Sequence, residues 1–159
     1  MKTIKGIIPP MITPLKGDDQ IDCEGTVRLT EHILAGGVHA LFLLGTTGEA
    51  QSLSYKCRYD FVELVCRQVV GVTDTSLDES VKLAVHAAAC GAVAVVAAAP
   101  YYFAPSQQEL IEYYTALADA LPLPLFLYNM PSHVKVFLEP ATVKTLAEHP
   151  NIVGLKDSS

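Results

Sequence analysis

The chain has 159 residues, of which 50% are apolar and 18% are charged, and its formal net charge is −6. This length fits one domain with a sizeable core, and this composition argues against an intrinsically disordered protein. The acidic balance, without any basic stripe, argues against a nucleic-acid partner. The apolar run at 92–99 is too short to cross a bilayer, so we expect no membrane span.

The N-terminus and the cysteines predict a cytoplasmic protein. Residues 1–5 include no long apolar stretch before a small-residue cleavage site, so we expect no signal peptide. Cys23, Cys57, Cys66 and Cys90 form no CxxC pair, which favours free thiols over a disulfide framework or a zinc site.

Short apolar runs alternate with longer amphipathic stretches along the whole chain. Strands are predicted at 6–12, 40–44, 92–99, 125–128 and 152–155. Helices are predicted at 22–35, from 54 to about 68 with Val69 on the apolar face, at 77–89, at 106–120 and at 140–148. Asp22 and Ser106 have the residue types of helix N-caps, and Glu109 completes a capping box with Ser106.

Continuous apolar strands separated by helices imply a parallel sheet with right-handed crossovers. A doubly wound sheet and a β/α barrel both fit this order. The glycine-rich motifs GxGxxG and GxxxxGK[ST], which bind nucleotide phosphates, are absent. Polar residues follow three strands, at 45–49, at Tyr128 and at Lys156. Because barrel active sites collect at the C-terminal ends of strands, this placement favours the barrel.

Lys156 stands where a short buried strand ends. An amine that is partly removed from water is favoured in its neutral form, which is nucleophilic toward carbonyl carbons. Tyr128 and the 45–48 turn end two other strands in the same way. Taken singly, the three features also fit a surface lysine, a core tyrosine and an ordinary turn.

The chain is short between the helix ending near residue 68 and the helix starting at Leu77. A loop and a full strand would need several more residues, so about seven residues are expected to be missing at Val70–Gly71. We therefore predict a break there, or a Cα–Cα span longer than the usual value of about 3.8 Å. The prediction is one partial barrel domain over 1–159, covering roughly the first six β/α units, with strand 3 largely missing.

Four motifs together resemble the dihydrodipicolinate synthase and N-acetylneuraminate lyase family. They are Gly45-Thr46-Thr47-Gly48-Glu49, Pro100-Tyr101-Tyr102, Tyr128-Asn129-Met130-Pro131 and Gly154-Leu155-Lys156-Asp157. The resemblance extends over the whole chain. It implies a TIM (β/α)8 barrel and a pyruvate-dependent class I (Schiff-base) aldolase or lyase, with no metal and no organic cofactor. It also implies a homo-oligomer, either a dimer or a tetramer.

The resemblance implies the following catalytic roles. Lys156 would form the imine with pyruvate, which then condenses with an aldehyde or keto-acid partner or releases one. Tyr128 would shuttle protons, and Thr46 would link it to Tyr102 in a hydroxyl relay. In the family this last tyrosine reaches across from a neighbouring subunit.

The resemblance also implies how the substrates are held. Thr47 and the backbone N–H groups between Gly45 and Gly48 would hold the pyruvate carboxylate, as tight glycine turns can hold an anion. His133 stands where dihydrodipicolinate synthases usually have an arginine for the second substrate's carboxylate. It is therefore a candidate for substrate choice, although a solvated loop histidine is also consistent with this position.

Two alternatives to a keto-acid aldolase stay open. One is 4-hydroxy-tetrahydrodipicolinate synthase itself, against which His133 argues. The other is a catalytically silent fragment or paralogue that only binds keto acids or partner subunits. The expected loss of strand 3 favours the silent protein, whereas the presence of every residue needed for the imine argues against it.

Overall fold

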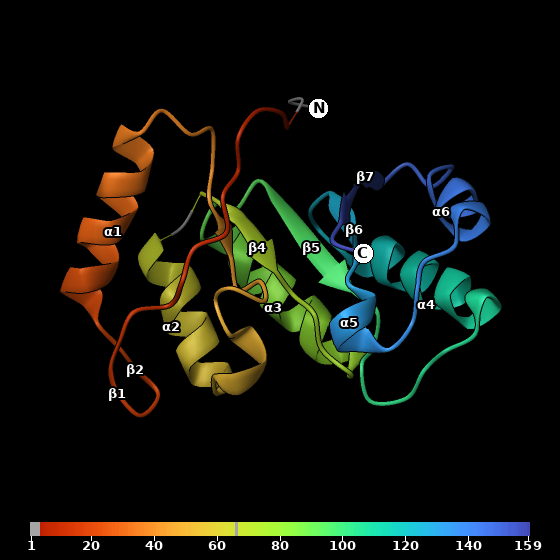
Figure 1. Ribbon diagram of the computed structural model, residues 1–159, viewed down its shortest axis with the longest axis horizontal. Helices are drawn as coiled ribbons and strands as arrows, with labels where there is room; N and C mark the ends of the chain where they lie inside the picture. The colour runs from red at the N-terminus through yellow and green to blue at the C-terminus, as the bar shows by residue number, and fades with distance from the viewer. Residues whose placement is uncertain (1–3, 66) are drawn as a thin grey trace.

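The computed structural model describes residues 4–65 and 67–159 (Figure 1). Its centre is a five-stranded parallel sheet in the order β3-β4-β5-β6-β7. The strands are β3 (Phe42–Leu43), β4 (Val69–Gly71), β5 (Ala94–Ala98), β6 (Leu125–Asn129) and β7 (Ile152–Asp157). Each strand pairs with the next one along the chain, which is the arrangement of consecutive β/α units. Cys66 lies outside the described residues.

Helices make the connections. They are α1 (Cys23–Ala35), α2 (Tyr55–Val65), α3 (Leu77–Ala89), α4 (Gln107–Ala120), α5 (Pro131–Val134) and α6 (Pro140–Leu146). A hairpin of β1 (Leu15–Gly17) and β2 (Gln20–Ile21) precedes α1, and the 3-10 turn η1 (Ala50–Ser52) precedes α2. None of the helices within 4–65 and 67–159 has both the length and the apolar character needed to cross a membrane.

The predicted helix starts at Asp22 and Ser106 are confirmed. The Asp22 carboxylate accepts a hydrogen bond of 3.0 Å from the Gly25 amide. Ser106 and Glu109 form the complete capping box, each side chain accepting from the other residue's backbone amide. Such caps satisfy amides that the first helical turn leaves without partners.

The strand predicted at 92–99 is also confirmed, as β5, and all five of its residues are buried. A strand covered on both faces has no polar side to alternate with its apolar side. From α4, Tyr114 packs fully buried onto this strand, and its hydroxyl donates to the Ala97 carbonyl at 3.3 Å. The core therefore lies on both faces of β5.

The prediction of a strand at 6–12 is wrong. This segment makes only one isolated parallel bridge, between Pro10 and Phe42, flanked by the hydrogen bonds from the Met11 amide to Phe42 and from the Phe42 amide to Pro9. Two consecutive prolines remove two amide donors from the ladder, which shortens the pairing. The segment nevertheless lies along β3, at the edge of the sheet.

The prediction of a break at Val70–Gly71 is also wrong. These two residues are consecutive members of β4 and pair with Val95 and Val96 of β5. The helix α2 ends at Val65, earlier than predicted, and Arg67 has a φ of 63°. A left-handed residue reverses the chain in very few residues after a helix, which leaves Val69 to β4 instead of the helix. The third barrel strand, which was expected to be largely missing, is therefore present as β4, although it is only 3 residues long.

Candidate active site

Tyr128 and Lys156 are direct neighbours across the β6–β7 pair. The Lys156 amine lies 3.9 Å from the centroid of the Tyr128 ring and 6.0 Å from that of Phe42. It donates a hydrogen bond of 2.8 Å to the Ser158 hydroxyl. An amine, a phenol and a second hydroxyl thus meet at the C-terminal ends of two adjacent strands, where barrel enzymes place their chemistry.

Thr46 joins this group from β3. The strand ends at Leu43 because Leu44 takes a left-handed φ of 54°, which turns the chain across the sheet edge. The Thr46 hydroxyl then lies 3.4 Å from the Tyr128 hydroxyl. Burial raises the pKa of Tyr128, but polar contacts with Thr46, Lys156 and Ser158 outweigh it and leave the pKa below its usual value. A tyrosine in this state gives up its proton more readily.

The 45–48 segment is a tight turn beside these groups. The Gly48 amide donates to Gly45 and the Glu49 amide to Thr46, both at 3.0 Å. The amides of Thr46 and Thr47 have no hydrogen-bond partner among residues 4–65 and 67–159. Adjacent amide donors without partners can bind an anion such as a carboxylate.

A cavity of about 360 Å³ opens beside Tyr128. Its polar lining consists of Thr46, Glu49, Gln51, Ser52, Thr73, Tyr101, Tyr128 and His133, and apolar residues such as Phe42, Leu44 and Met130 complete it. The Nδ1 atom of His133 lies 2.9 Å from the Ser132 hydroxyl. Among the described lining residues there is no lysine or arginine, so His133 is the one side chain there that can become cationic. Glu49 is the one carboxylate among the same residues.

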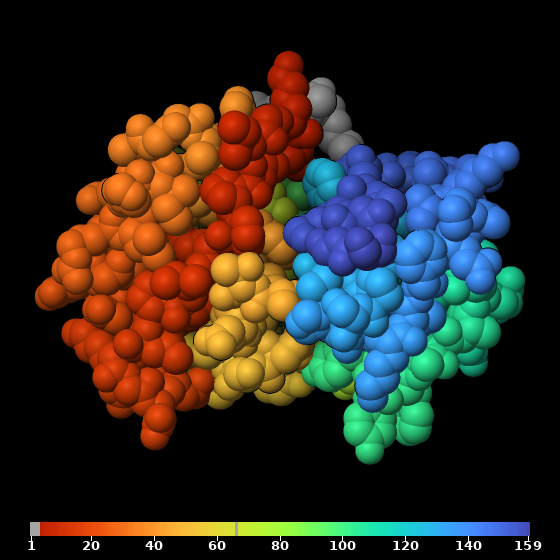
Figure 2. All heavy atoms as spheres, in the orientation of Figure 1, coloured from red at the N-terminus to blue at the C-terminus, as the bar shows by residue number. Residues whose placement is uncertain are grey.

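The structure thus brings most of the predicted site residues together. Thr46, Tyr128, Gly45 and His133 line the cavity, and Lys156 contacts the Tyr128 ring. Thr47 and Gly48 belong to the same turn as Thr46, but neither they nor Lys156 are among the described cavity-lining residues. In Figure 2 the C-terminal residues, in dark blue, lie on the viewed face between the red N-terminal segment and the lighter blue residues around α6.

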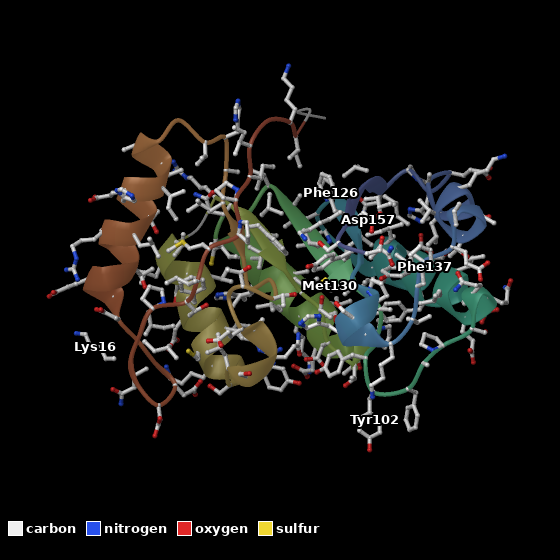
Figure 3. The ribbon with its side chains drawn as sticks, in the orientation of Figure 1. Lys16, Tyr102, Phe126, Met130, Phe137 and Asp157 are labelled. Atoms are coloured by element: carbon white, nitrogen blue, oxygen red, sulfur yellow. The ribbon has the colours of Figure 1, made fainter. Side chains whose placement is uncertain are left out.

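Tyr102 does not join the others within the chain. It is 72% exposed and packs edge-on against Phe103, with ring centroids 4.9 Å apart. Figure 3 shows it pointing outward at the rim, far from Met130 and Asp157. Its neighbour Tyr101 lines the cavity instead. A relay from Thr46 to Tyr102 is therefore not formed inside this chain.

Several residues that line the cavity were not predicted from the sequence. Thr73 follows β4, so it occupies the same strand-end position as the predicted residues, but that strand was expected to be missing. Its hydroxyl accepts from the Ala98 amide at 2.9 Å, and its carbonyl accepts from Gln51 at 2.8 Å. Tyr101 belongs to the Pro100-Tyr101-Tyr102 motif, but the motif does not show which of its two tyrosines faces the cavity. Gln51 carried no sequence signal, because its place in the wall depends on packing between distant segments.

Comparisons with known proteins find relatives in sequence and in fold. The family model of the dihydrodipicolinate synthetase family matches residues 3–159. The structure of dihydrodipicolinate synthase from Bacteroides thetaiotaomicron is 58% identical, with a TM-score of 0.93 over 97% of this chain and 54% of its own. The 4-hydroxy-tetrahydrodipicolinate synthase of Phenylobacterium zucineum is 36% identical over 98% of this chain and 55% of its own length. The Escherichia coli protein YagE, named as a putative 2-dehydro-3-deoxy-D-gluconate aldolase, is 38% identical over 96% and 53%.

The chain spans about half the length of the curated relatives that it matches. The parallel sheet of the chain corresponds to that half of the related structures. Two of these structures, the synthase of Acinetobacter baumannii and YagE, are complexes with pyruvate, and their TM-scores to this chain are 0.93 and 0.91.

Proposed function

Because the chain belongs to the dihydrodipicolinate synthetase family, we propose that the full-length protein is a pyruvate-dependent Schiff-base lyase or synthase. In this proposal, residues 1–159 are part of one closed (β/α)8 barrel domain. The observation that carries it is the cluster of the Lys156 amine, the Tyr128 ring and the Thr46 hydroxyl at the C-terminal ends of β7, β6 and β3. The pyruvate complexes of two similar structures support the choice of substrate.

The proposed reaction begins with pyruvate. The neutral Lys156 amine attacks the ketone carbon, water leaves, and a protonated imine forms. That cation withdraws electrons, so a proton leaves the methyl group and an enamine nucleophile results. Tyr128 carries protons to and from the reacting atoms, with the Thr46 hydroxyl as its relay partner. The enamine adds to an aldehyde, and the reverse reaction cleaves a γ-hydroxy-α-keto acid.

The pyruvate carboxylate is proposed to bind at the Gly45–Gly48 turn. The two amides of Thr46 and Thr47 that lack partners in the described chain are its donors, and the Thr47 hydroxyl adds a third. This arrangement holds an anion without a cationic side chain. It leaves the cavity bounded by His133 and Gln51 for the second substrate.

The second substrate is proposed to be a hydroxy-aldehyde or another small aldehyde, as a keto-acid aldolase uses. Its support is His133, which offers at most one donor where arginine would offer two to a carboxylate. The 58% identity to a dihydrodipicolinate synthase favours a second candidate, condensation with aspartate semialdehyde. Comparing the two classes of aldehyde with one purified protein separates the candidates.

Tyr102 is proposed to serve an oligomer. Its side chain is exposed at the rim and carries Phe103 beside it, so it is accessible to a second subunit. In a dimer or tetramer it would supply the hydroxyl that the single chain does not bring to Thr46.

Borohydride reduction in the presence of pyruvate tests the imine. Hydride addition converts the imine into a stable secondary amine, and the protein gains the mass of pyruvic acid and two hydrogens less the water lost on imine formation. We expect this gain in the full-length protein and its complete loss in Lys156→Ala. A folded protein that gains no mass with pyruvate would refute the proposed function.

A further inference from the structure

Beyond the residues that react, Asn129 and Asp157 form a clamp across the same two strands. They are the next directly paired residues after Tyr128 and Lys156. The Asn129 amide nitrogen donates to the Asp157 carboxylate at 2.9 Å. Successive strand residues point to opposite faces of a sheet, so the clamp lies on the face opposite to the reacting side chains.

Each polar group of the buried Asn129 side chain has a partner. Its side-chain oxygen accepts a hydrogen bond from the Leu138 amide at 3.0 Å, and its side-chain nitrogen donates one to the Asp157 carboxylate. Its backbone carbonyl accepts from the Ser158 amide at 2.9 Å. Ser158 in turn accepts the hydrogen bond from the Lys156 amine. These contacts therefore hold the backbone that directly follows Lys156, at Asp157 and Ser158.

The pairing of β6 with β7 contains a register shift between Leu125 and Phe126, before the reacting residues. A contact that fixes the register near Lys156 therefore matters for the position of its side chain. Leu125 pairs with Ile152 but Phe126 pairs with Gly154, so Val153 is an extra residue in β7. A slip by one residue would move the Lys156 side chain to the other face of the sheet. Phe126 and Gly154 fix the register before the reacting pair, since a Cβ at Gly154 would lie 2.5 Å from the Phe126 ring. The Asn129–Asp157 pair fixes it afterwards.

We propose that Asn129 and Asp157 are positioning residues that align the Lys156 amine with Tyr128. This inference rests on the proposed function, because the alignment matters only if Lys156 forms the imine. The hydrogen bond from Asn129, followed by that from the Ser159 amide, lowers the pKa of Asp157, so the carboxylate stays charged and the clamp stays closed at neutral pH.

The chain offers an exchange of partners as a test. Asn129→Asp places two carboxylates against each other and removes the donor. In the double variant Asn129→Asp/Asp157→Asn the donor and acceptor are exchanged, and Leu138 keeps its acceptor. A matched control is Asn151→Ala just before β7, at the end of the strand far from the site, where the Asn151 amide nitrogen donates to the Ala118 carbonyl at 2.9 Å.

The measurement is the rate of pyruvate trapping by cyanoborohydride in the full-length protein, as a function of pyruvate concentration. For Asn129→Asp we expect the rate at saturating pyruvate to fall by about tenfold to a hundredfold, because misplacement by about 1 Å can cost that much. The half-saturating concentration should stay nearly constant, since the Gly45–Gly48 turn is unchanged. The double variant should recover most of the rate, and Asn151→Ala should keep it while lowering the melting temperature.

Three results would overturn the inference. They are an unchanged rate in Asn129→Asp, no recovery in the double variant, and an equal loss of rate in Asn151→Ala. Absence of trapping in the unmodified protein would instead refute the proposed function, and the positioning role would fall with it.

Discussion

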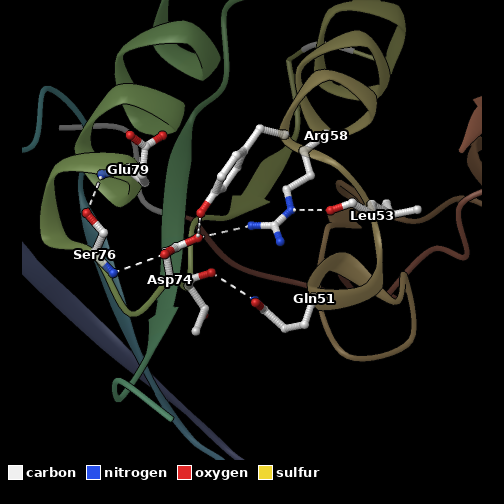
Figure 4. A network of polar contacts seen from close by, with 8 residues as sticks. Gln51, Leu53, Arg58, Asp74, Ser76 and Glu79 are labelled. Carbon is white, nitrogen blue, oxygen red and sulfur yellow. Dashed lines mark hydrogen bonds and ion pairs between the residues drawn. The ribbon is translucent and has the colours of Figure 1, made fainter. Parts of the chain in front are cut away.

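Removal of the Asp74 carboxylate should destabilise the fold strongly. Asp74 and Arg58 are 5% and 8% exposed at their side chains, and Arg58 Nη1 lies 3.3 Å from Asp74 Oδ2 (Figure 4). The same oxygen accepts from the Tyr55 hydroxyl at 3.0 Å, and the other oxygen accepts from the Ser76 amide at 3.0 Å. This network joins α2 to the loop after β4, which carries Thr73 to the cavity.

The expected loss for Asp74→Ala is about 3–5 kcal/mol in the free energy of unfolding. That range applies when one member of a buried pair is removed and the other charge stays buried without its partner. Among the described residues, the Arg58 guanidinium would keep the Leu53 carbonyl, at 3.2 Å from Nε, and the Tyr55 ring, at 4.9 Å, as its polar and aromatic partners. Domains are stable by only about 5–15 kcal/mol, so the variant should be marginal.

Urea denaturation followed by far-UV circular dichroism measures this change. The double variant Arg58→Met/Asp74→Ala removes both charges, so it should be more stable than Asp74→Ala alone. A loss below about 1 kcal/mol in Asp74→Ala, which is typical of exposed pairs, would refute the reasoning. So would a double variant at least as unstable as the single one.

Two further predictions concern single positions. Gly71→Ala should cost about 1–3 kcal/mol in the free energy of unfolding, because the new Cβ would lie 2.3 Å from the Leu44 carbonyl oxygen. Gly17→Ala has open space around it, so the same urea denaturation should show no change in stability. Equal stability of the two variants would contradict the close packing of β4 on the loop after β3. His133→Arg should raise the activity of the full-length protein with aspartate semialdehyde relative to hydroxy-aldehydes, and efficient use of aspartate semialdehyde by the unmodified protein would contradict the argument from His133.

Features that depend on neighbouring residues could be predicted from the sequence. The Asp22 and Ser106 caps, the buried strand β5 and the polar groups at strand ends all follow from short residue patterns. The placement of Thr46, Tyr128 and Lys156 together followed from one rule, that the C-terminal ends of parallel strands share an edge of the sheet.

Features that depend on distant contacts could not be predicted in this way. The early end of α2 and the left-handed Arg67 shorten the path to β4, and neither has a sequence signal of its own. Residues 6–12 have the apolar content of a strand; Pro9 and Pro10 were the sequence signal against it, but the single remaining bridge to Phe42 depends on the distant β3. The Asn129–Asp157 pair became visible only when the register between β6 and β7 was known.

The most direct test of the central claim is to locate the reduced pyruvate adduct by peptide mass mapping of the full-length protein. We expect borohydride and pyruvate to modify Lys156, and we expect no adduct in Lys156→Ala. We further expect slower trapping in Tyr128→Phe, because the imine is then formed without its proton carrier. An adduct on another lysine, or a folded protein without any adduct, would contradict the account and favour a protein that only binds keto acids or partner subunits.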